Sequence, residues 1–261
     1  SFPTDALPIS LAGALAGLLM TAADISTSLH FAAVLLADVL IAAVALRHLP
    51  ATSDGERSEQ THSGGFIAQV RHELRDRQLL ILGVVILAMA LAEGSANDWL
   101  PLLMIDGHNL SHTQGTLVYA GFTAGMTLGR FLGGYVVDRI GRVWMLRVSA
   151  FSAAFGLMLV IFSDNSWLAA AAVLFWGIGA ALGFPLTVSA AGDGNNSAIR
   201  VTIAATLGYL AFLVGPPGLG FIGEHAGLRM AMLPVLALVV IALFCAGAAG
   251  SRKLEKAQQA S

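Results

Sequence analysis

Charged side chains and cysteines are scarce in this chain of 261 residues. Asp, Glu, Lys and Arg make up 11% of it, whereas a soluble domain carries about 25%. The single cysteine, Cys245, lies in an apolar run and excludes an intrachain disulfide. The net charge of −2 and the confinement of charge to short segments argue against a nucleic-acid partner. With so little polar surface, the chain cannot be a soluble globule.

Long apolar runs fill the rest of the chain. Hydrophobic residues make up 56% of the sequence and the mean hydropathy is +0.76. A helix that crosses the hydrocarbon core of a bilayer needs about 20 apolar residues. Runs of about this length predict an all-α, polytopic transmembrane bundle of about eight helices in a lipid bilayer. The predicted helices are 6–23, 29–46, 78–104, 114–137, 143–163, 166–190, 200–223 and 229–250.

Two polar segments divide the predicted bundle. Residues 1–46 carry two helices, 47–77 form a polar linker, 78–250 carry six helices, and 251–261 form a tail. The end of the linker has apolar and basic residues at helical spacing, which predicts an amphipathic helix on the membrane surface or, alternatively, an extension of the next transmembrane helix. These residues are Phe66, Ile67, Val70, Leu74, Arg71, Arg75 and Arg77.

The distribution of Lys and Arg predicts the orientation. If the linker is cytoplasmic, alternating sides place every one of the 14 Lys and Arg residues except Arg229 at or near the inner side. Positive residues concentrate on the cytoplasmic side of membrane proteins. We therefore expect the linker, the 138–142 loop and the tail to face the cytoplasm.

A short charged loop separates two of the apolar runs. It reads Gly134-Tyr-Val-Val-Asp138-Arg139-Ile-Gly141-Arg142 and resembles the cytoplasmic signature loop of the major facilitator superfamily, G-x-L-a-D-r-x-G-r, with valines at two apolar positions. The segments 92–99 and 208–229 also resemble helices of bacterial members. The resemblance implies two six-helix halves joined by a long cytoplasmic loop. The chain would then be a fragment that lacks about four N-terminal helices.

The same resemblance implies a cytoplasmic gate. Gly134 would allow close helix approach and Gly141 a tight turn, while Asp138 would act as a latch facing arginines and a helix N-terminus. The implied partners are Arg139 and Arg142, with Arg130 one or two turns deeper. Alternatively, the basic residues only anchor the helices to anionic headgroups.

Small residues and prolines predict helix packing and bending. Gly121, Gly125, Gly129 and Gly133 repeat every four residues, so they place a smooth stripe on one helix face. Glycines at 177, 179 and 183 lie in an apolar helix, which favours packing over nucleotide binding. Prolines in the middle of apolar runs predict hinges at Pro185, Pro216 and Pro217.

One carboxyl group lies near the middle of a predicted cavity-lining helix. Glu93 has Asn97 one turn away on the same face, with Asp98 and Trp99 just beyond. Because ionisable groups in the membrane are costly, they are functional candidates. We expect Glu93 and these three neighbours to form the path for protons or solute. The alternative is that the Glu93 carboxyl group makes a structural hydrogen bond to a neighbouring helix.

These features favour a secondary transporter over an enzyme. No nucleotide-binding G-x-x-x-x-G-K-[ST] motif is present, and all seven histidines fall at predicted helix ends or in loops, so no buried base, metal site or cofactor is expected. The predicted function is transport of a small-molecule solute by alternating access, coupled to protons, in a bacterial inner (plasma) membrane. The alternatives are a receptor or scaffold on the same fold and a membrane-embedded enzyme.

Overall fold

The computed structural model describes residues 63–193 and 196–250, together with six helical positions between 29 and 40. The chain divides into two units, Ser1–Ser63 and Gly64–Ser261. The first predicted helix, 6–23, most of the second and the tail 251–261 lie outside the described residues.

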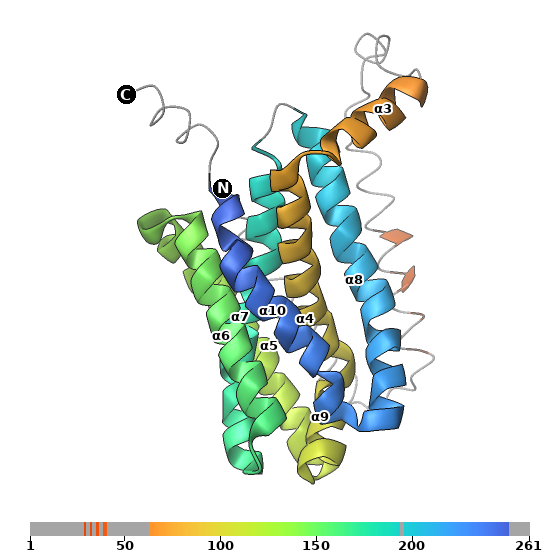
Figure 1. The fold of residues 1–261 in the computed structure, drawn as a ribbon. Coiled ribbons are helices and arrows are strands. Elements are labelled where there is room, and N and C mark those ends of the chain that lie inside the picture. The colour runs from red at the N-terminus through yellow and green to blue at the C-terminus, as the bar shows by residue number, and fades with distance from the viewer. Residues whose placement is uncertain are drawn as a thin grey trace. The chain divides into compact units, whose positions relative to one another are not determined.

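Helices make up the described part of this unit (Figure 1). Five of them, counting α9 to η1 as one, are long and apolar enough to cross a membrane. The prediction of an all-α transmembrane bundle is therefore confirmed. The elements are α3 (Ser63–Glu73), α4 (Arg77–His108), α5 (His112–Ile140), α6 (Arg142–Phe162), α7 (Ser166–Ala191), α8 (Ser197–Ala226), α9 (Leu228–Ala231), α10 (Leu233–Cys245) and the short 3₁₀ helix η1 (Ala246–Ala249).

Side-chain caps and glycine turns delimit the helices. The Asp76 carboxylate accepts a hydrogen bond from the Gln78 backbone N–H at 2.9 Å and so begins α4. Ser111 and Gln114 form a reciprocal capping box at the start of α5. Gly141, with φ of 80°, turns the chain between α5 and α6. Because α3 ends at Glu73 and a turn precedes α4, the alternative of a simple extension of the transmembrane helix is wrong.

Polar contacts define two ends of the bundle. At one end Gln78 donates to the carbonyl of Ala248 at 2.7 Å, and Arg200 at the start of α8 pairs with Asp76 at 2.6 Å. At the opposite end Arg229 donates to the carbonyl of Ser163 at 2.7 Å. We call these the Arg200 end and the Arg229 end. The short connections between antiparallel helices bring sequence-distant loops together at each end.

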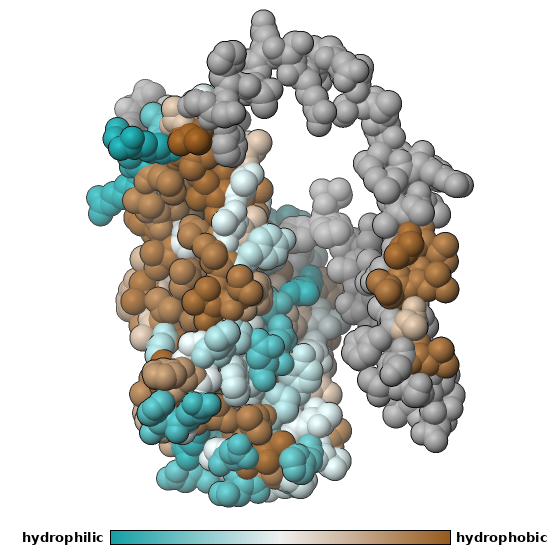
Figure 2. All heavy atoms as spheres, turned by 90° about the vertical axis from the view of Figure 1, so that its right-hand side faces the viewer, coloured by the Kyte–Doolittle hydropathy of each residue, from teal (hydrophilic) through white to brown (hydrophobic). Residues whose placement is uncertain are grey.

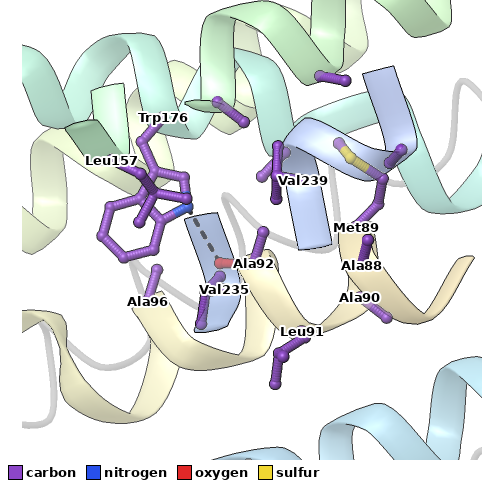
Figure 3. Packing of buried hydrophobic residues seen from close by; sticks show 14 of the residues in the cluster. Ala88, Met89, Ala90, Leu91, Ala92, Ala96, Leu157, Trp176, Val235 and Val239 are labelled. Atoms are coloured by element: carbon purple, nitrogen blue, oxygen red, sulfur yellow. Dashed lines mark hydrogen bonds between the residues drawn. The ribbon is translucent and has the colours of Figure 1, made fainter. Parts of the chain in front are cut away.

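Helix α4 lies at the centre of the apolar core. Trp176 on α7 is fully buried and donates its indole N–H to the carbonyl of Ala92 at 3.1 Å, with Leu157 and Val235 packed nearby (Figure 3). The Phe122 ring on α5 meets the Trp176 ring edge-on, with centroids 5.6 Å apart. One large aromatic side chain thus joins α4, α5 and α7.

Glycines allow α5 and α7 to pack closely. A methyl group at Gly125 would lie 3.1 Å from the Leu174 carbonyl, and one at Gly129 would lie 2.7 Å from the Ala181 side chain. Gly133 leaves no room beside Leu182, whereas Gly121 makes only ordinary contact. The glycines at 177, 179 and 183 of α7 press on α5, α6 and α4 respectively. These glycines set how closely the helix backbones approach.

Candidate functional site

A polar stripe runs along α5 on the side that meets α4. Its members recur at intervals of three or four positions, which places them on one helix face. They lower the hydropathy of α5, which is 29 residues long but is not among the five helices apolar enough to count as candidate spans. The stripe consists of Thr116, Tyr119, Thr123, Thr127 and Arg130.

An ion pair joins this stripe to α4 at about half its depth. Arg130 Nη2 lies 2.9 Å from Glu93 Oε1, and Glu93 is near the middle of Arg77–His108. The Glu93 side chain is 14% exposed and that of Arg130 is 47% exposed. Arg130 also donates its Nε–H to the carbonyl of Ala181 on α7 at 3.3 Å. The pair offsets the cost of placing each charge at this depth.

Further polar groups extend the site toward the Arg229 end. The Tyr119 hydroxyl donates to Asn97 Oδ1 at 3.4 Å. Asn97 and Asp98 are exposed. We call Glu93, Asn97, Asp98 and the α5 stripe the mid-depth site. It contains two acids and one guanidinium.

The surface of the unit is not uniformly apolar. In Figure 2, hydrophilic and near-neutral side chains extend from about the middle of the face down to the end drawn at the bottom, beneath a mostly apolar upper part. A span that faces lipid all round would show no such area, because exposed charge in hydrocarbon is costly. Part of this face therefore suits water, solute or protein rather than lipid.

The other predicted pathway residue, Trp99, makes a different contact. Its indole N–H donates to the carbonyl of Pro216 on α8 at 3.0 Å. Helices α7 and α8 continue through Pro185, Pro216 and Pro217. Trp99 thus links α4 to the proline pair, and hinge motion at these prolines stays a prediction.

The signature loop forms the turn between α5 and α6 at the Arg200 end. Arg142 pairs with Asp193, which follows α7, at 2.7 Å. Arg139 lies over the Tyr135 ring, 4.1 Å from its centroid. Asp138 is exposed and makes no ion pair within the described residues. The implied pairs of Asp138 with Arg139 and Arg142 are therefore absent here.

Arg130 belongs to the mid-depth site rather than to the loop. Its carboxylate partner is Glu93 on α4, not Asp138, which lies about two turns away on the same helix. The sequence interpretation recognised each residue but did not pair them. The regular spacing of the α5 stripe was the available signal for a polar face.

The sequence did not indicate that Arg200, at the Arg200 end, would be buried in an ionic cluster. Arg200 is 2% exposed, and its Nη1 lies 2.9 Å from Glu73 Oε2 and 2.6 Å from Asp76 Oδ2. Its Nε–H donates to the Ala191 carbonyl at 2.9 Å. Asn196 donates to the second Glu73 oxygen at 2.6 Å. We call these residues the Arg200 cluster; it ties α3 to the ends of α7 and α8.

The Arg200 cluster favours the ionised form of Glu73. Burial by itself would raise the pKa of this carboxyl group, but hydrogen bonds from Asn196 and Arg200 and the charge of Arg200 together hold the pKa below its ordinary value. The cluster is therefore a stable ionic contact at neutral pH. Within the described residues, no group of His, Cys, Asp and Glu side chains is arranged to hold a metal ion.

Comparisons with known proteins identify the family. The sequence profile of the Major Facilitator Superfamily matches residues 6–198 and 99–258. An uncharacterized transporter, y4wD, of Sinorhizobium fredii is 31% identical over 195 residues, which are 74% of this chain and 49% of that protein. Membrane protein MosC of Rhizobium meliloti is 32% identical over 171 residues, covering 65% of this chain and 42% of MosC. The chain belongs to the Major Facilitator Superfamily and is a multi-pass integral membrane protein.

Solved structures share the fold. The E. coli fucose:proton symporter FucP in its outward conformation superposes with a TM-score of 0.68 and 14% identity, covering 84% of this chain and 53% of FucP. A variant of FucP gives a TM-score of 0.62 with 13% identity, covering 72% of this chain and 46% of the variant. The chain spans about half the length of its relatives.

Proposed function

We propose that the protein containing this chain is a secondary transporter that moves a small solute across a bacterial inner membrane by alternating access, coupled to protons. The observation that carries the proposal is the Glu93–Arg130 ion pair, half-open and at mid-depth in a helix bundle. The relative y4wD is named an uncharacterized transporter, and FucP, which shares the fold, is named a fucose:proton symporter. Intramembrane ion pairs of this kind typically mark ion or substrate pathways.

Protonation of Glu93 would change this pair. A neutral carboxylic acid no longer balances the guanidinium of Arg130, so uptake of a proton weakens the link between α4 and α5. The helices then favour a different arrangement, and the proton drives transport by shifting that equilibrium. In this proposal Asn97, Asp98 and Trp99 line the route beside Glu93.

The signature loop would act at the cytoplasmic side. Asp138, Arg139 and Arg142 lie around the Gly141 turn at the Arg200 end, and Gly134 lies one turn below Asp138. Since Asp138 is exposed and unpaired within the described part, its carboxylate is available to a segment outside it. We assign these residues to the gate and the prolines at 185, 216 and 217 to the bending that opens it.

Substitution of Glu93 tests the proposal. Glu93→Gln keeps the size of the side chain and mimics its protonated form, so the variant should exchange solute across proteoliposome membranes but lose accumulation driven by a pH gradient. Glu224→Gln, at an exposed position near the Arg229 end, is the matched control and should accumulate solute normally. Undiminished accumulation by Glu93→Gln would remove Glu93 from the mechanism.

A further inference from the structure

The mid-depth site also indicates the chemical class of its solute. Resting on the function proposed above, we infer that Arg130 binds the carboxylate of a small hydroxylated monocarboxylate, which takes the place of Glu93 when Glu93 is protonated. The inference depends on three features: the free donors of Arg130, the hydroxyl groups beside it, and the charge of the site.

Arg130 has fewer of its donors occupied than Arg200, which pairs with two carboxylates. Arg200 meets two carboxylates and a carbonyl and is almost fully buried. Arg130 meets one carboxylate through one nitrogen and a carbonyl through another, and its side chain is 47% exposed. A guanidinium carries five donors in a planar fork that matches a carboxylate. Arg130 therefore keeps donors available on the open side of the pair.

Hydroxyl groups line the approach to this guanidinium. The hydroxyls of Thr123 and Thr127 donate to carbonyls of their own helix at 2.9 Å each, which leaves their oxygens free to accept hydrogen bonds. Tyr119 and Asn97 add further polar groups on the same side. A solute that bears hydroxyl groups next to its carboxylate can donate to these oxygens.

The charge of the site limits the solute to one negative charge. When Glu93 is neutral, the guanidinium of Arg130 is the positive group and Asp98 adds a negative charge farther along α4. A monocarboxylate restores the balance that Glu93 supplied. A phosphate dianion would add a second negative charge near Asp98, which would repel it.

Proton and solute would then bind cooperatively. A proton on Glu93 frees Arg130 for the solute carboxylate, and the bound carboxylate in turn favours the neutral form of Glu93. Such coupling is reciprocal between two ligands. The monocarboxylate should consequently bind more tightly as the pH is lowered, as long as the solute itself stays ionised.

Matched pairs of acids and alcohols test this inference. The purified protein, expressed from its complete gene, is titrated calorimetrically with glycolate, glycerate and gluconate and with their neutral counterparts ethylene glycol, glycerol and glucitol. Because charge-assisted hydrogen bonds are strong, the preferred carboxylate should bind about 10- to 100-fold more tightly than its alcohol. Arg130→Gln should abolish this preference, while Arg75→Gln, at an exposed position outside the membrane spans, should retain it.

Two more variants keep the test decisive. Arg130→Lys retains the positive charge without the planar fork, so it should bind the carboxylate with intermediate affinity. This variant also tests the inference if Arg130→Gln does not fold. Glu93→Gln should bind the carboxylate with no dependence on pH. Carboxylates that bind no better than their alcohols, or a preference that persists in Arg130→Gln, would overturn the inference.

Proton flux separates this inference from the proposed function. A pH-sensitive dye inside proteoliposomes reports proton entry when each solute is added. Carboxylate binding that depends on Arg130 but moves no protons would leave the solute site intact and remove the proton coupling. Proton flux driven by the neutral alcohols and lost in Glu93→Gln would support the coupling and overturn the carboxylate site.

Discussion

Two arginines in this unit, Arg200 and Arg130, differ in how deeply they are buried and in how many of their hydrogen-bond donors are occupied. Arg200 is 2% exposed and bound by Glu73, Asp76 and the Ala191 carbonyl. Arg130 lies farther from the end of its helix than Arg200 does, yet its side chain is half exposed and has one carboxylate partner, Glu93. An arginine whose hydrogen-bond donors are all occupied within the fold is held in place. An arginine with unoccupied donors can exchange one carboxylate partner for another. We therefore expect Arg200 to contribute mainly to stability, whereas Arg130 is the arginine that we propose for transport.

The largest effect on stability should follow from Arg200→Met. The substitution preserves bulk but leaves Glu73 and Asp76 facing each other without their shared cation. Breaking a buried ion pair by removing one partner costs about 3–5 kcal/mol. Denaturation in detergent should show this loss for Arg200→Met and little change for Arg75→Met; equal stability of the two variants would place Arg200 outside the folding core.

A smaller loss is expected where α5 meets α7. Gly129→Ala places a methyl group 2.7 Å from the Ala181 side chain, and overpacking of this kind costs about 1–3 kcal/mol. Gly121→Ala on the same stripe meets only Leu174 at 3.8 Å and is the matched control. Thermal unfolding compares the two variants. If both unfold at the wild-type temperature, the glycine stripe does not limit helix approach.

Asp138→Asn should affect transport but not stability. The carboxylate is exposed, so its removal should leave the unfolding temperature near that of the wild type, while loss of the gate contact should reduce transport severalfold. Crosslinking of cysteine pairs across the cytoplasmic side reports the closed gate, whose yield should fall in the variant. Normal uptake with an unchanged crosslinking yield would favour simple headgroup anchoring.

The smallest expected effect is a pH dependence from Glu73. Its pKa is lower in the folded protein than its ordinary value, so its contribution to stability is present above the ordinary carboxyl range and is lost as the pH falls through the lowered pKa. Glu73→Gln should remove this part of the acid dependence. Unfolding measured from neutral to acidic pH should give a shallower decline for the variant; parallel curves would contradict the assigned role.

Long apolar runs made the bundle predictable from the sequence. The predicted helices 78–104 and 143–163 correspond to α4 and α6 with small shifts at their ends, because the length of a membrane span limits the choice of boundaries. Ion-pair partners were not predictable in the same way. Glu73 and Arg200 are 127 residues apart, and only the fold brings the end of α3 to the start of α8.

For the mid-depth site, the sequence indicated the residues but not how they pair. Glu93 was recognisable because a carboxyl group in the middle of an apolar run is rare, and the α5 stripe has a regular spacing. The choice of Glu93 rather than Asp138 as the partner of Arg130 depends on how α4 packs on α5. That packing follows from Trp176, Phe122 and the glycines of α5 and α7, whose combined effect no local pattern shows.

Infrared difference spectroscopy of the reconstituted protein tests the central claim most directly, because it observes the protonation of Glu93 itself. Acidification should produce the absorption of a protonated carboxyl group that disappears in Glu93→Gln and persists in Asp98→Asn, and added solute should increase it. A spectrum unchanged by Glu93→Gln, with or without solute, would show that Glu93 stays ionised beside Arg130 and would contradict its role in proton coupling.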